Sequence, residues 1–233
     1  MDRGATDAYE GQAAIFLKKS PAVQPPHYVE AEFICAQLAN QIRLPVPPSF
    51  VAELPGEEDR PAFAALAFNL AGGSTPPIIP AEAVAAEPDL CTGVIVFDAW
   101  IINIDRHTKN ISFQALRVPH KLNVFDHSHT LFFYPDNFTH FAGKLGITGE
   151  RGSRHCLLDA LPTAEHVGKW VERIGRVPAD IIRELCQDAV DLGLPQDVAD
   201  STAVSLIDRK DRLGAVIAAS RAEFLGVVDW PIL

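Results

Sequence analysis

An almost wholly apolar stretch runs through residues 89–104, and it limits the possible folds more than any other part of the sequence. Asp98 is its only internal charge. At about 16 residues the stretch is too long for an ordinary strand and too short for a membrane span. A helix that is apolar on all sides is normally buried. The stretch therefore predicts a buried helix.

Ahead of this stretch, the sequence predicts a small sheet that carries one helix. An apolar run at 13–17, which ends in two lysines, suits a buried strand. A helix is expected at 28–42, because apolar residues recur there at helical spacing. Two further strands are expected at 49–54 and 63–68, with a charged turn between them.

After the apolar stretch, the sequence predicts two short strands followed by helices. The strands are expected at 111–113 and 121–125, joined by a turn around Pro119. Four helices are expected in the rest of the chain, at 165–174, 179–192, 196–207 and 209–224.

Charge and cysteine content exclude several classes of function. Thirty acidic and twenty basic residues give a formal charge of -10, which repels nucleic-acid phosphates and anionic membranes. The four cysteines form no CxxC pair, so buried free thiols are expected rather than a zinc knuckle or a redox motif. The N-terminus lacks the charged-then-apolar order of a secretory signal. We therefore expect a folded cytoplasmic protein without a nucleic-acid or membrane partner.

Polar residues suited to phosphate chemistry follow the apolar stretch. Segment 103–110 reads Asn-Ile-Asp-Arg-His-Thr-Lys-Asn, and Asp126 directly follows the second expected strand. In phosphoryl transfer a loop aspartate orients or deprotonates the acceptor hydroxyl, while an asparagine and a second aspartate bind Mg²⁺. Any one of these residues alone is more often a turn cap. The ordered set of Asp105, Asn110 and Asp126 favours phosphoryl transfer.

Two segments together resemble those of a known kinase family. Segment 98–110 reads Asp-Ala-Trp-Ile-Ile-Asn-Ile-Asp-Arg-His-Thr-Lys-Asn, and segment 125–128 reads Phe-Asp-His-Ser. They resemble the catalytic and metal-binding segments of HipA-like kinases and, more distantly, of phosphatidylinositol 3- and 4-kinases. Segment 37–47 also resembles the end of the small-lobe helix of that family, although Arg43 stands where a glycine is common. The resemblance spans about residues 13–134.

The resemblance implies a role for each residue that matches the family's motifs. Asp105 corresponds to the catalytic aspartate, Asn110 to a metal ligand and Asp126 to the aspartate of the kinase Asp-Phe-Gly motif. Lys18, in the first expected strand, would hold the nucleotide phosphates, and Glu32 would be its ion-pair partner.

Lys19 and Glu30 are the alternatives to this pair. Adjacent strand residues point to opposite faces, so only one of the two lysines can face the cleft. Glu30 and Glu32 lie about 200° apart around the helix, so only one of them can face the lysine. A further interpretation is a solvated lysine pair at the end of a strand.

Arg106 and His107 are assigned to the catalytic segment, where the resemblance implies that they support the loop and the metal-binding aspartate. The histidines around the two aspartates also suggest a zinc hydrolase, because zinc binds imidazole and carboxylate. These histidines are His107, His120, His127 and His129. However, no HExxH spacing is present, and His127 and His129 lack a third placed ligand.

Two departures from the family pattern concern nucleotide binding. About a dozen residues precede the first expected strand, so Gly4 and Thr6 are assigned to a short phosphate-covering turn in the absence of GxGxxG. Ser128 stands where a glycine often follows Asp-His in the relatives. Both features leave a second hypothesis open, a catalytically weak or inactive pseudokinase that serves as a nucleotide-binding or protein-interaction scaffold.

The resemblance implies an α+β fold of two lobes. A reduced N-terminal sheet lobe would comprise residues 1–70, and a hinge with a mainly helical lobe holding the catalytic hairpin would comprise residues 71–233. The implied activity is a kinase that uses ATP and Mg²⁺ and phosphorylates a hydroxyl, with a protein Ser/Thr favoured over a lipid or small molecule. The terminal segment 227–233 is expected to fold back on the core, and an exposed docking edge is the alternative.

Overall fold

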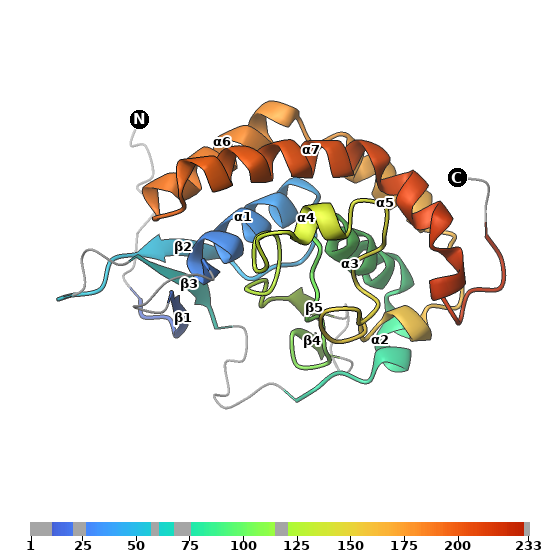
Figure 1. Ribbon diagram of the computed structural model, residues 1–233. Helices are drawn as coiled ribbons and strands as arrows, with labels where there is room; N and C mark the ends of the chain where they lie inside the picture. Colours follow the sequence, from blue (N-terminus) through green and yellow to red (C-terminus); the bar gives the residue numbers. More distant parts are fainter. Residues whose placement is uncertain (1–10, 21–26, 57–60, 68–75, 115–120, 231–233) are drawn as a thin grey trace, which may run out of the picture.

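The computed structural model shows a small antiparallel sheet beside a larger group of helices (Figure 1). It describes residues 11–20, 27–56, 61–67, 76–114 and 121–230. In Figure 1 the sheet lies at the left, and the longest helix runs along the top of the molecule. This division into a small sheet part and a mainly helical part matches the predicted fold class.

The sheet has the strand order β1–β3–β2, and both pairs are antiparallel. Its strands are β1 (Ile15–Lys19), β2 (Ser49–Ala52) and β3 (Ala62–Leu66). The three strands predicted for this part are thus confirmed, but the burial predicted for β1 is wrong, since Phe16 is 55% exposed. The reason is that β1 lies at the edge of a small sheet, where it has a strand on one side only.

Helix α1 (Tyr28–Gln41) connects the sheet to the helical part, and it confirms the predicted helix. Val29 and Ala36 pack with Phe63 of β3, whereas Leu38 belongs to the main hydrophobic core. The helix therefore buries one face against the sheet and another against the helices. This double burial explains why the hydrophobic residues of α1 occupy more than one face of the helix.

The turn that follows α1 contains a left-handed residue, Arg43, with a φ of 57°. The Leu44 amide donates to the Ala39 carbonyl at 2.9 Å, and the Arg43 amide donates to the Asn40 carbonyl at 3.1 Å. Such a turn closes a helix and favours glycine, which has no Cβ to clash. The conformation explains why a glycine is common at this position in the family pattern.

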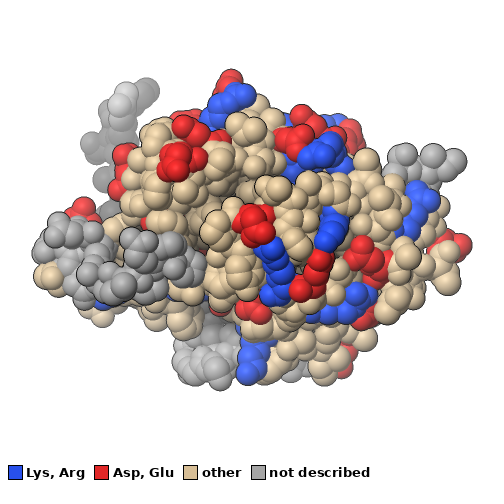
Figure 2. Space-filling view, viewed as in Figure 1, with Lys and Arg blue, Asp and Glu red and all other residues tan. Residues whose placement is uncertain are grey.

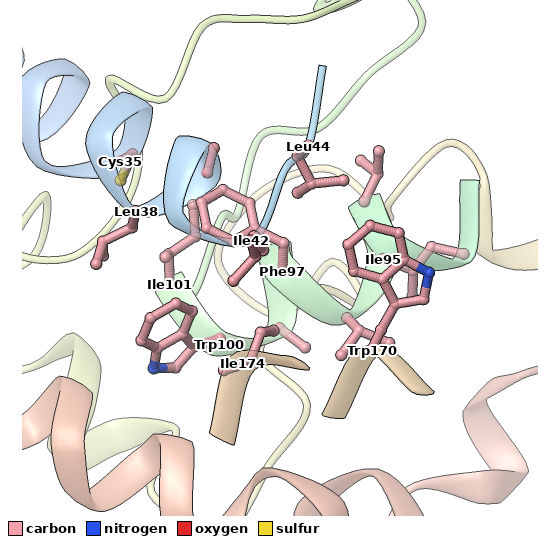
Figure 3. Close-up of a cluster of buried hydrophobic side chains, with 14 of the residues drawn as sticks. Cys35, Leu38, Ile42, Leu44, Ile95, Phe97, Trp100, Ile101, Trp170 and Ile174 are labelled. Carbon is pink, nitrogen blue, oxygen red and sulfur yellow. The ribbon is translucent and has the colours of Figure 1, made fainter. Parts of the chain in front are cut away.

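Helix α3 (Pro88–Ile101) is the predicted buried helix, and the short helix α2 (Pro80–Ala86) precedes it. Helix α3 ends earlier than predicted because Ile102 adopts a left-handed conformation, with a φ of 55°, and the Asn103 amide donates back to the Asp98 carbonyl. Figure 3 shows the two buried tryptophans, Trp100 and Trp170, on either side of this core.

The packing between α3 and α5 (Val167–Gly175) depends on a glycine. A Cβ at Gly93 of α3 would lie 2.4 Å from the ring of Trp170, so no larger residue fits there without movement of the ring. The Trp170 indole also donates to the Asp89 carbonyl at 2.8 Å. The start of α3 is therefore fixed against α5.

Helices α6 (Ala179–Asp191) and α7 (Gln196–Ala219) pack against each other over the remaining core. The prediction of two helices at 196–207 and 209–224 is wrong, because α7 is one continuous helix of 24 residues. The charged run between the two predicted helices contains neither glycine nor proline. Two of its residues are buried instead of breaking the helix: Arg209 donates to the Ala99 carbonyl at 2.7 Å, and Lys210 donates to the Val177 carbonyl at 3.0 Å.

The predicted hairpin is present as β4 (Ile111–Gln114) and β5 (Lys121–Val124), which pair antiparallel. The turn around Pro119 lies outside the described residues. The rest of the chain contains helix α4 (Asn137–His140) and two 3-10 turns, η1 (Leu158–Ala160) and η2 (Arg221–Glu223).

The end of the described chain agrees with the predicted fold-back. The ring of Trp230 packs edge-on against Phe224, with centroids 5.0 Å apart, whereas Val228 is 86% exposed. The four cysteines are free, and three of them are buried, as predicted. Within the described residues, no helix combines the length and the apolar character needed to cross a membrane.

Candidate active site

A pocket of about 530 Å³ lies between the sheet, helix α1 and the end of strand β5. Most of its lining is apolar and comes from both parts of the fold, including Phe16, Ala36, Val46, Phe63 and Val124. Charged side chains also line the pocket: Lys18, Glu32, Lys109 and Asp126. The pocket therefore combines a surface suited to a flat apolar group with a set of groups suited to phosphate and metal.

Lys18 connects the two parts of the fold at this pocket. Its ammonium lies 2.6 Å from Glu32 Oε1 on α1 and 2.6 Å from Asp126 Oδ1 after β5. Burial by itself lowers the pKa of Lys18, but the two carboxylates outweigh burial and hold the pKa above its ordinary value. Lys18 is therefore charged and is placed by two carboxylates.

The structure distinguishes the predicted pair from its alternatives. Lys19 does not line the pocket, which agrees with the opposite faces of adjacent strand residues. Glu30 is buried, but it lies with Ser20 and His27, each 3.3 Å from a carboxylate oxygen. Lys18 and Glu32 are thus the pair that meets at the pocket.

Glu32 also fixes the loop that follows β5. The backbone amide of His127 donates to Glu32 Oε1 at 3.0 Å, and the His127 Nδ1 atom lies 3.5 Å from Oε2. Burial alone raises the pKa of Glu32, but the contacts with His127 and Lys18 bring it below the ordinary value. The buried carboxylate is therefore ionised and connects α1 to residues 126–127.

Asp126 sits in a left-handed conformation, with a φ of 62°, which aspartate tolerates better than most residues. The Ser128 hydroxyl donates to Asp126 Oδ1 at 2.7 Å. Burial raises the pKa of this carboxyl, but Lys18 and Ser128 outweigh it, and the pKa lies well below the usual range. Ser128, which replaces a glycine of the family pattern, therefore gives Asp126 an additional hydrogen bond.

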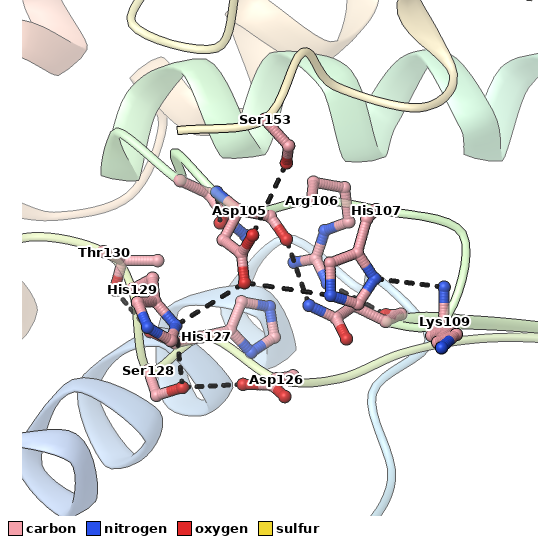
Figure 4. A network of polar contacts seen from close by, with 12 residues as sticks. Asp105, Arg106, His107, Lys109, Asp126, His127, Ser128, His129, Thr130 and Ser153 are labelled. Carbon is pink, nitrogen blue, oxygen red and sulfur yellow. Dashed lines mark hydrogen bonds and ion pairs between the residues drawn. The ribbon is translucent and has the colours of Figure 1, made fainter. Parts of the chain in front are cut away.

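Asp105 lies in the loop between α3 and β4, and its carboxylate faces three side chains (Figure 4). Oδ1 is 3.5 Å from the Ser153 hydroxyl. Oδ2 lies between two imidazoles, 3.8 Å from His107 Nε2 and 3.6 Å from His129 Nδ1. These contacts are long, and the carboxylate is 34% exposed, so Asp105 remains accessible to a further partner.

Asn110 closes the same loop. Its side-chain amide donates to the Asp105 carbonyl at 3.0 Å, and this bond orients the opposite, oxygen-bearing side of the amide away from that carbonyl. The two ends of the 105–110 segment are thereby fixed relative to each other.

Arg106 is completely buried beneath this loop. It makes two hydrogen bonds to Asp98 of α3, at 2.7 and 3.1 Å, and donates to the carbonyls of Asn110 and Phe125. One guanidinium thus binds the backbone of both Phe125, next to Asp126, and Asn110, at the end of the 105–110 segment. Arg106 therefore connects this loop to α3 through Asp98.

Sequence reasoning missed His155, which completes the buried network. Its Nε2 atom lies 3.0 Å from Asp98 Oδ2, and its Nδ1 atom accepts from the Leu157 amide at 3.2 Å. Burial lowers the pKa of His155, and the imidazole is neutral in this arrangement. Burial raises the pKa of Asp98, but Arg106 and His155 outweigh it and keep the pKa far below the usual range.

Ser153 was also missed, because nothing in its spacing relates it to Asp105, whereas His129 was considered only as one of four possible zinc ligands around the two aspartates. One local signal exists, at Gly152: a Cβ there would lie 2.0 Å from the Ile104 carbonyl oxygen. Only glycine allows this segment to lie against the backbone just before Asp105. The Ser153 amide then donates to the same carbonyl at 2.9 Å.

Some assigned residues lie in parts of the chain that the structure does not describe. Gly4 and Thr6, assigned to nucleotide binding, and His120 lie outside the described residues. Among the residues that are described, no group of three or more His, Cys, Asp or Glu side chains is arranged to hold a metal ion. His127 faces Glu32 while His107 and His129 face Asp105, so the histidines divide between two carboxylates.

Two solved structures are similar to this fold. The Helicobacter pylori proinflammatory kinase CtkA superposes with a TM-score of 0.57 at 11% identity, and the match covers 90% of this chain and 91% of that chain. A chain of the Shewanella oneidensis MR-1 toxin–antitoxin complex of HipA, HipB and operator DNA gives a TM-score of 0.51 at 14% identity, covering 89% and 60%. At these identities, the similarity shows a kinase-like fold.

A comparison with curated proteins finds no match. A protein-family model, described as HipA-like kinase, matches residues 1–141, which is more than half of the chain. The matched region includes Lys18, Glu32, Asp105, Asn110 and Asp126. Taken with the two-lobed fold and the pocket between its parts, this match means that the chain belongs to the HipA-like kinase family.

Proposed function

We propose that the protein is an ATP-dependent kinase that transfers the γ-phosphate of ATP to a hydroxyl group, with a protein serine or threonine as the acceptor. The observation that carries the proposal is the position of Lys18, whose ammonium lies 2.6 Å from both Glu32 and Asp126 in a pocket of suitable size. This ammonium bridges the sheet part and the helical part. We divide the two lobes at residues 1–70 and 71–233.

The apolar side of the pocket suits a nucleobase, and Lys18 supplies positive charge for the phosphates. A phosphate oxygen would accept a charge-assisted hydrogen bond from the ammonium. Since Glu32 and Asp126 already fix the ammonium, little side-chain entropy remains to be lost when a nucleotide binds. Glu32 thus acts as the positioning residue for Lys18.

Asn110 and Asp126 fit a magnesium ion by their chemistry. Asp126 is ionised, and Asn110 uses its amide nitrogen for the Asp105 carbonyl, so an amide oxygen remains. Mg²⁺ prefers such oxygen ligands and usually completes its shell with phosphate oxygens and water. When bound, the ion would neutralise phosphate charge.

Asp105 would accept the proton of the acceptor hydroxyl, or orient that hydroxyl toward the γ-phosphorus. In the balanced reaction the acceptor oxygen bonds to phosphorus, the bond between the γ-phosphorus and the bridging oxygen breaks, and ADP leaves. Arg106 supports the reacting loop from below, since it binds Asp98, Asn110 and Phe125 at once. His107 flanks the accepting carboxylate.

The test is transfer of labelled γ-phosphate by the purified protein, to itself or to a cell extract, with ATP and magnesium. Asp105→Asn is expected to reduce transfer by a factor on the order of 10³ while ATP binding is retained. Asp126→Asn is expected to reduce both phosphate transfer and ATP binding. Asp180→Asn is the matched control, because Asp180 is a 95% exposed aspartate of α6.

A protein that binds ATP but transfers no phosphate would replace this proposal with the pseudokinase hypothesis. Absence of nucleotide binding in the wild-type protein would contradict both. Equal transfer by the wild type and the Asp105→Asn variant would remove Asp105 from the mechanism.

A further inference from the structure

A row of partly exposed aromatic rings lies next to Asp105. The His129 ring is 4.4 Å from that of Phe133, and the Phe133 ring is 4.9 Å from that of Tyr134, measured between centroids. Tyr28, at the start of α1, stacks on Phe133 at 6.4 Å. We call these four residues the aromatic surface. Tyr134 is 36% exposed, and the other three are partly exposed.

The aromatic surface is continuous with the reacting groups but separate from the pocket. His129 Nδ1 lies 3.6 Å from Asp105 Oδ2 and 3.4 Å from the Ser128 hydroxyl, which in turn binds Asp126. None of the four aromatic residues lines the pocket that holds Lys18. A molecule on the aromatic surface would therefore reach Asp105 from outside the pocket proposed for the nucleotide.

The basic side chains of the segment that follows are already used in ion pairs. Lys144 lies 2.7 Å from Glu150, Arg151 lies 2.6 Å from Asp136, and Arg154 lies 2.6 Å from Asp159. Figure 2 shows basic and acidic side chains next to one another on the face that carries α4. An acceptor with several phosphate groups would need unpaired cations, so this face favours an acceptor without them.

The length of the row indicates what kind of acceptor fits. Successive centroids of His129, Phe133 and Tyr134 are 4.4 and 4.9 Å apart, whereas an extended polypeptide rises about 3.3 Å per residue. The row is therefore long enough for a chain segment of two or three residues, which is more than a small alcohol offers. Partly exposed aromatic rings bind apolar and aromatic side chains well.

We propose that the aromatic surface is the acceptor subsite, and that it takes an extended polypeptide segment in which an aromatic or large aliphatic residue lies next to the phosphorylated serine or threonine. The inference rests on the proposed kinase function and adds the place where the acceptor binds and the flanking residue that it prefers. Phe133 is its central residue, because it contacts Tyr28, His129 and Tyr134.

The experiment uses the full-length wild-type protein, ATP, magnesium and a positional-scanning peptide library around a fixed Ser/Thr. Selection of Phe, Tyr, Leu or Met at one flanking position is expected. For the selected peptide, Phe133→Ala is expected to raise KM about tenfold, while KM for ATP stays unchanged. Val204→Ala, which truncates an exposed apolar residue of α7, is the control.

Phe133→Leu keeps an apolar side chain without the ring, and it replaces Phe133→Ala if the latter loses ATP binding or its folded structure. An unchanged peptide KM in the folded variant would overturn the inference. So would wild-type transfer without a flanking apolar preference, and in that case the proposed kinase function would stand. A preference for inositol-lipid acceptors would overturn both the inference and the proposed protein acceptor, and only the transfer of γ-phosphate to a hydroxyl would stand. If the wild type binds ATP but transfers phosphate to nothing, the kinase function fails, and the inference fails with it.

Discussion

Asp126 and Asp105 are the two carboxylates of the site, and their surroundings differ. Asp126 makes contacts of 2.6 Å to Lys18 and 2.7 Å to Ser128, and its pKa is held far below the usual range mainly because Lys18 outweighs burial. Among the described residues, the Asp105 carboxylate has only contacts of 3.5 to 3.8 Å, to one serine and two histidines.

The difference matches the order in which the two sides would be used. On the Asp126 side, the groups are in place before anything binds, which lowers the entropic cost of holding a nucleotide. On the Asp105 side, the carboxylate makes no short hydrogen bond within the described residues that an acceptor hydroxyl would have to replace. Both sides rest on the same buried pair, Asp98 and Arg106. Arg106 donates to the Phe125 carbonyl, which directly precedes Asp126, and to the Asn110 carbonyl, which ends the loop of Asp105.

The largest effect is expected from Asp98→Ala, which removes the support common to both sides. The Arg106 guanidinium would remain completely buried without its carboxylate. We expect the free energy of unfolding to fall by about 3–5 kcal/mol, measured by urea denaturation. Asp98→Asn, which keeps the shape and some hydrogen bonds, is the comparison. A loss below about 1 kcal/mol in Asp98→Ala would show that the pair is not the common support.

Lys18→Met would affect the Asp126 side alone. Loss of one charge-assisted hydrogen bond is worth about 1.5–3 kcal/mol, so the Kd for ATP is expected to rise roughly ten- to hundredfold by calorimetry. Lys19→Met, on the neighbouring strand position, is the matched control and is expected to bind ATP nearly as the wild type does. Equal losses in the two variants would contradict the assignment of Lys18.

The pH dependence of stability tests the shared support through His155. Its pKa in the folded protein lies below the ordinary 6.5, so the unfolded chain binds more protons as the pH falls below that value. Stability contributed by neutral His155 is therefore complete above pH 6.5 and decreases below it, by up to about 1.4 kcal/mol per pH unit.

In urea denaturation between pH 7 and 5, His155→Gln is expected to lack this part of the slope. His166→Gln, at a partly exposed histidine, serves as the control and should keep it. Identical slopes in the wild type and His155→Gln would mean that His155 does not couple protonation to folding.

The smallest effects compare the two serines, one on each carboxylate. Ser128→Ala removes a 2.7 Å bond to Asp126, and it is expected to cost about 1 kcal/mol in thermal or urea unfolding. Ser153→Ala removes a 3.5 Å contact to Asp105, and it should cost a few tenths of a kcal/mol. A reversed order would contradict the proposed difference between the two sides.

Much of the fold could be predicted from local patterns. The buried helix, the hairpin and the three-stranded sheet follow from periodicity and apolar runs, which act over neighbouring residues. The exposure of β1 and the unbroken course of α7 could not be predicted this way. In β1 the missing information is its place at the sheet edge, and in α7 it is the carbonyl partners that Arg209 and Lys210 find on other segments.

The site divides in the same way. Asp105, Asn110 and Asp126 stand out because their order along the chain carries the chemistry. The choice of Lys18 over Lys19 needed the structure, since strand alternation leaves open which face meets the cleft. His155 lies 57 positions from its partner Asp98 along the chain, and Ser153 lies 48 positions from Asp105, so no local spacing identifies them.

The contact between Lys18 and Asp126 joins residues 108 positions apart in the chain. Closing so long a loop costs conformational entropy that local contacts must first offset, so we expect this contact to form late in folding. Because Lys18 lies on β1 and Asp126 follows β5, the group proposed to bind phosphate is complete only after both parts of the protein have folded and docked. During synthesis or refolding, the catalytic groups would therefore come together last, and partly folded chains would lack an assembled site.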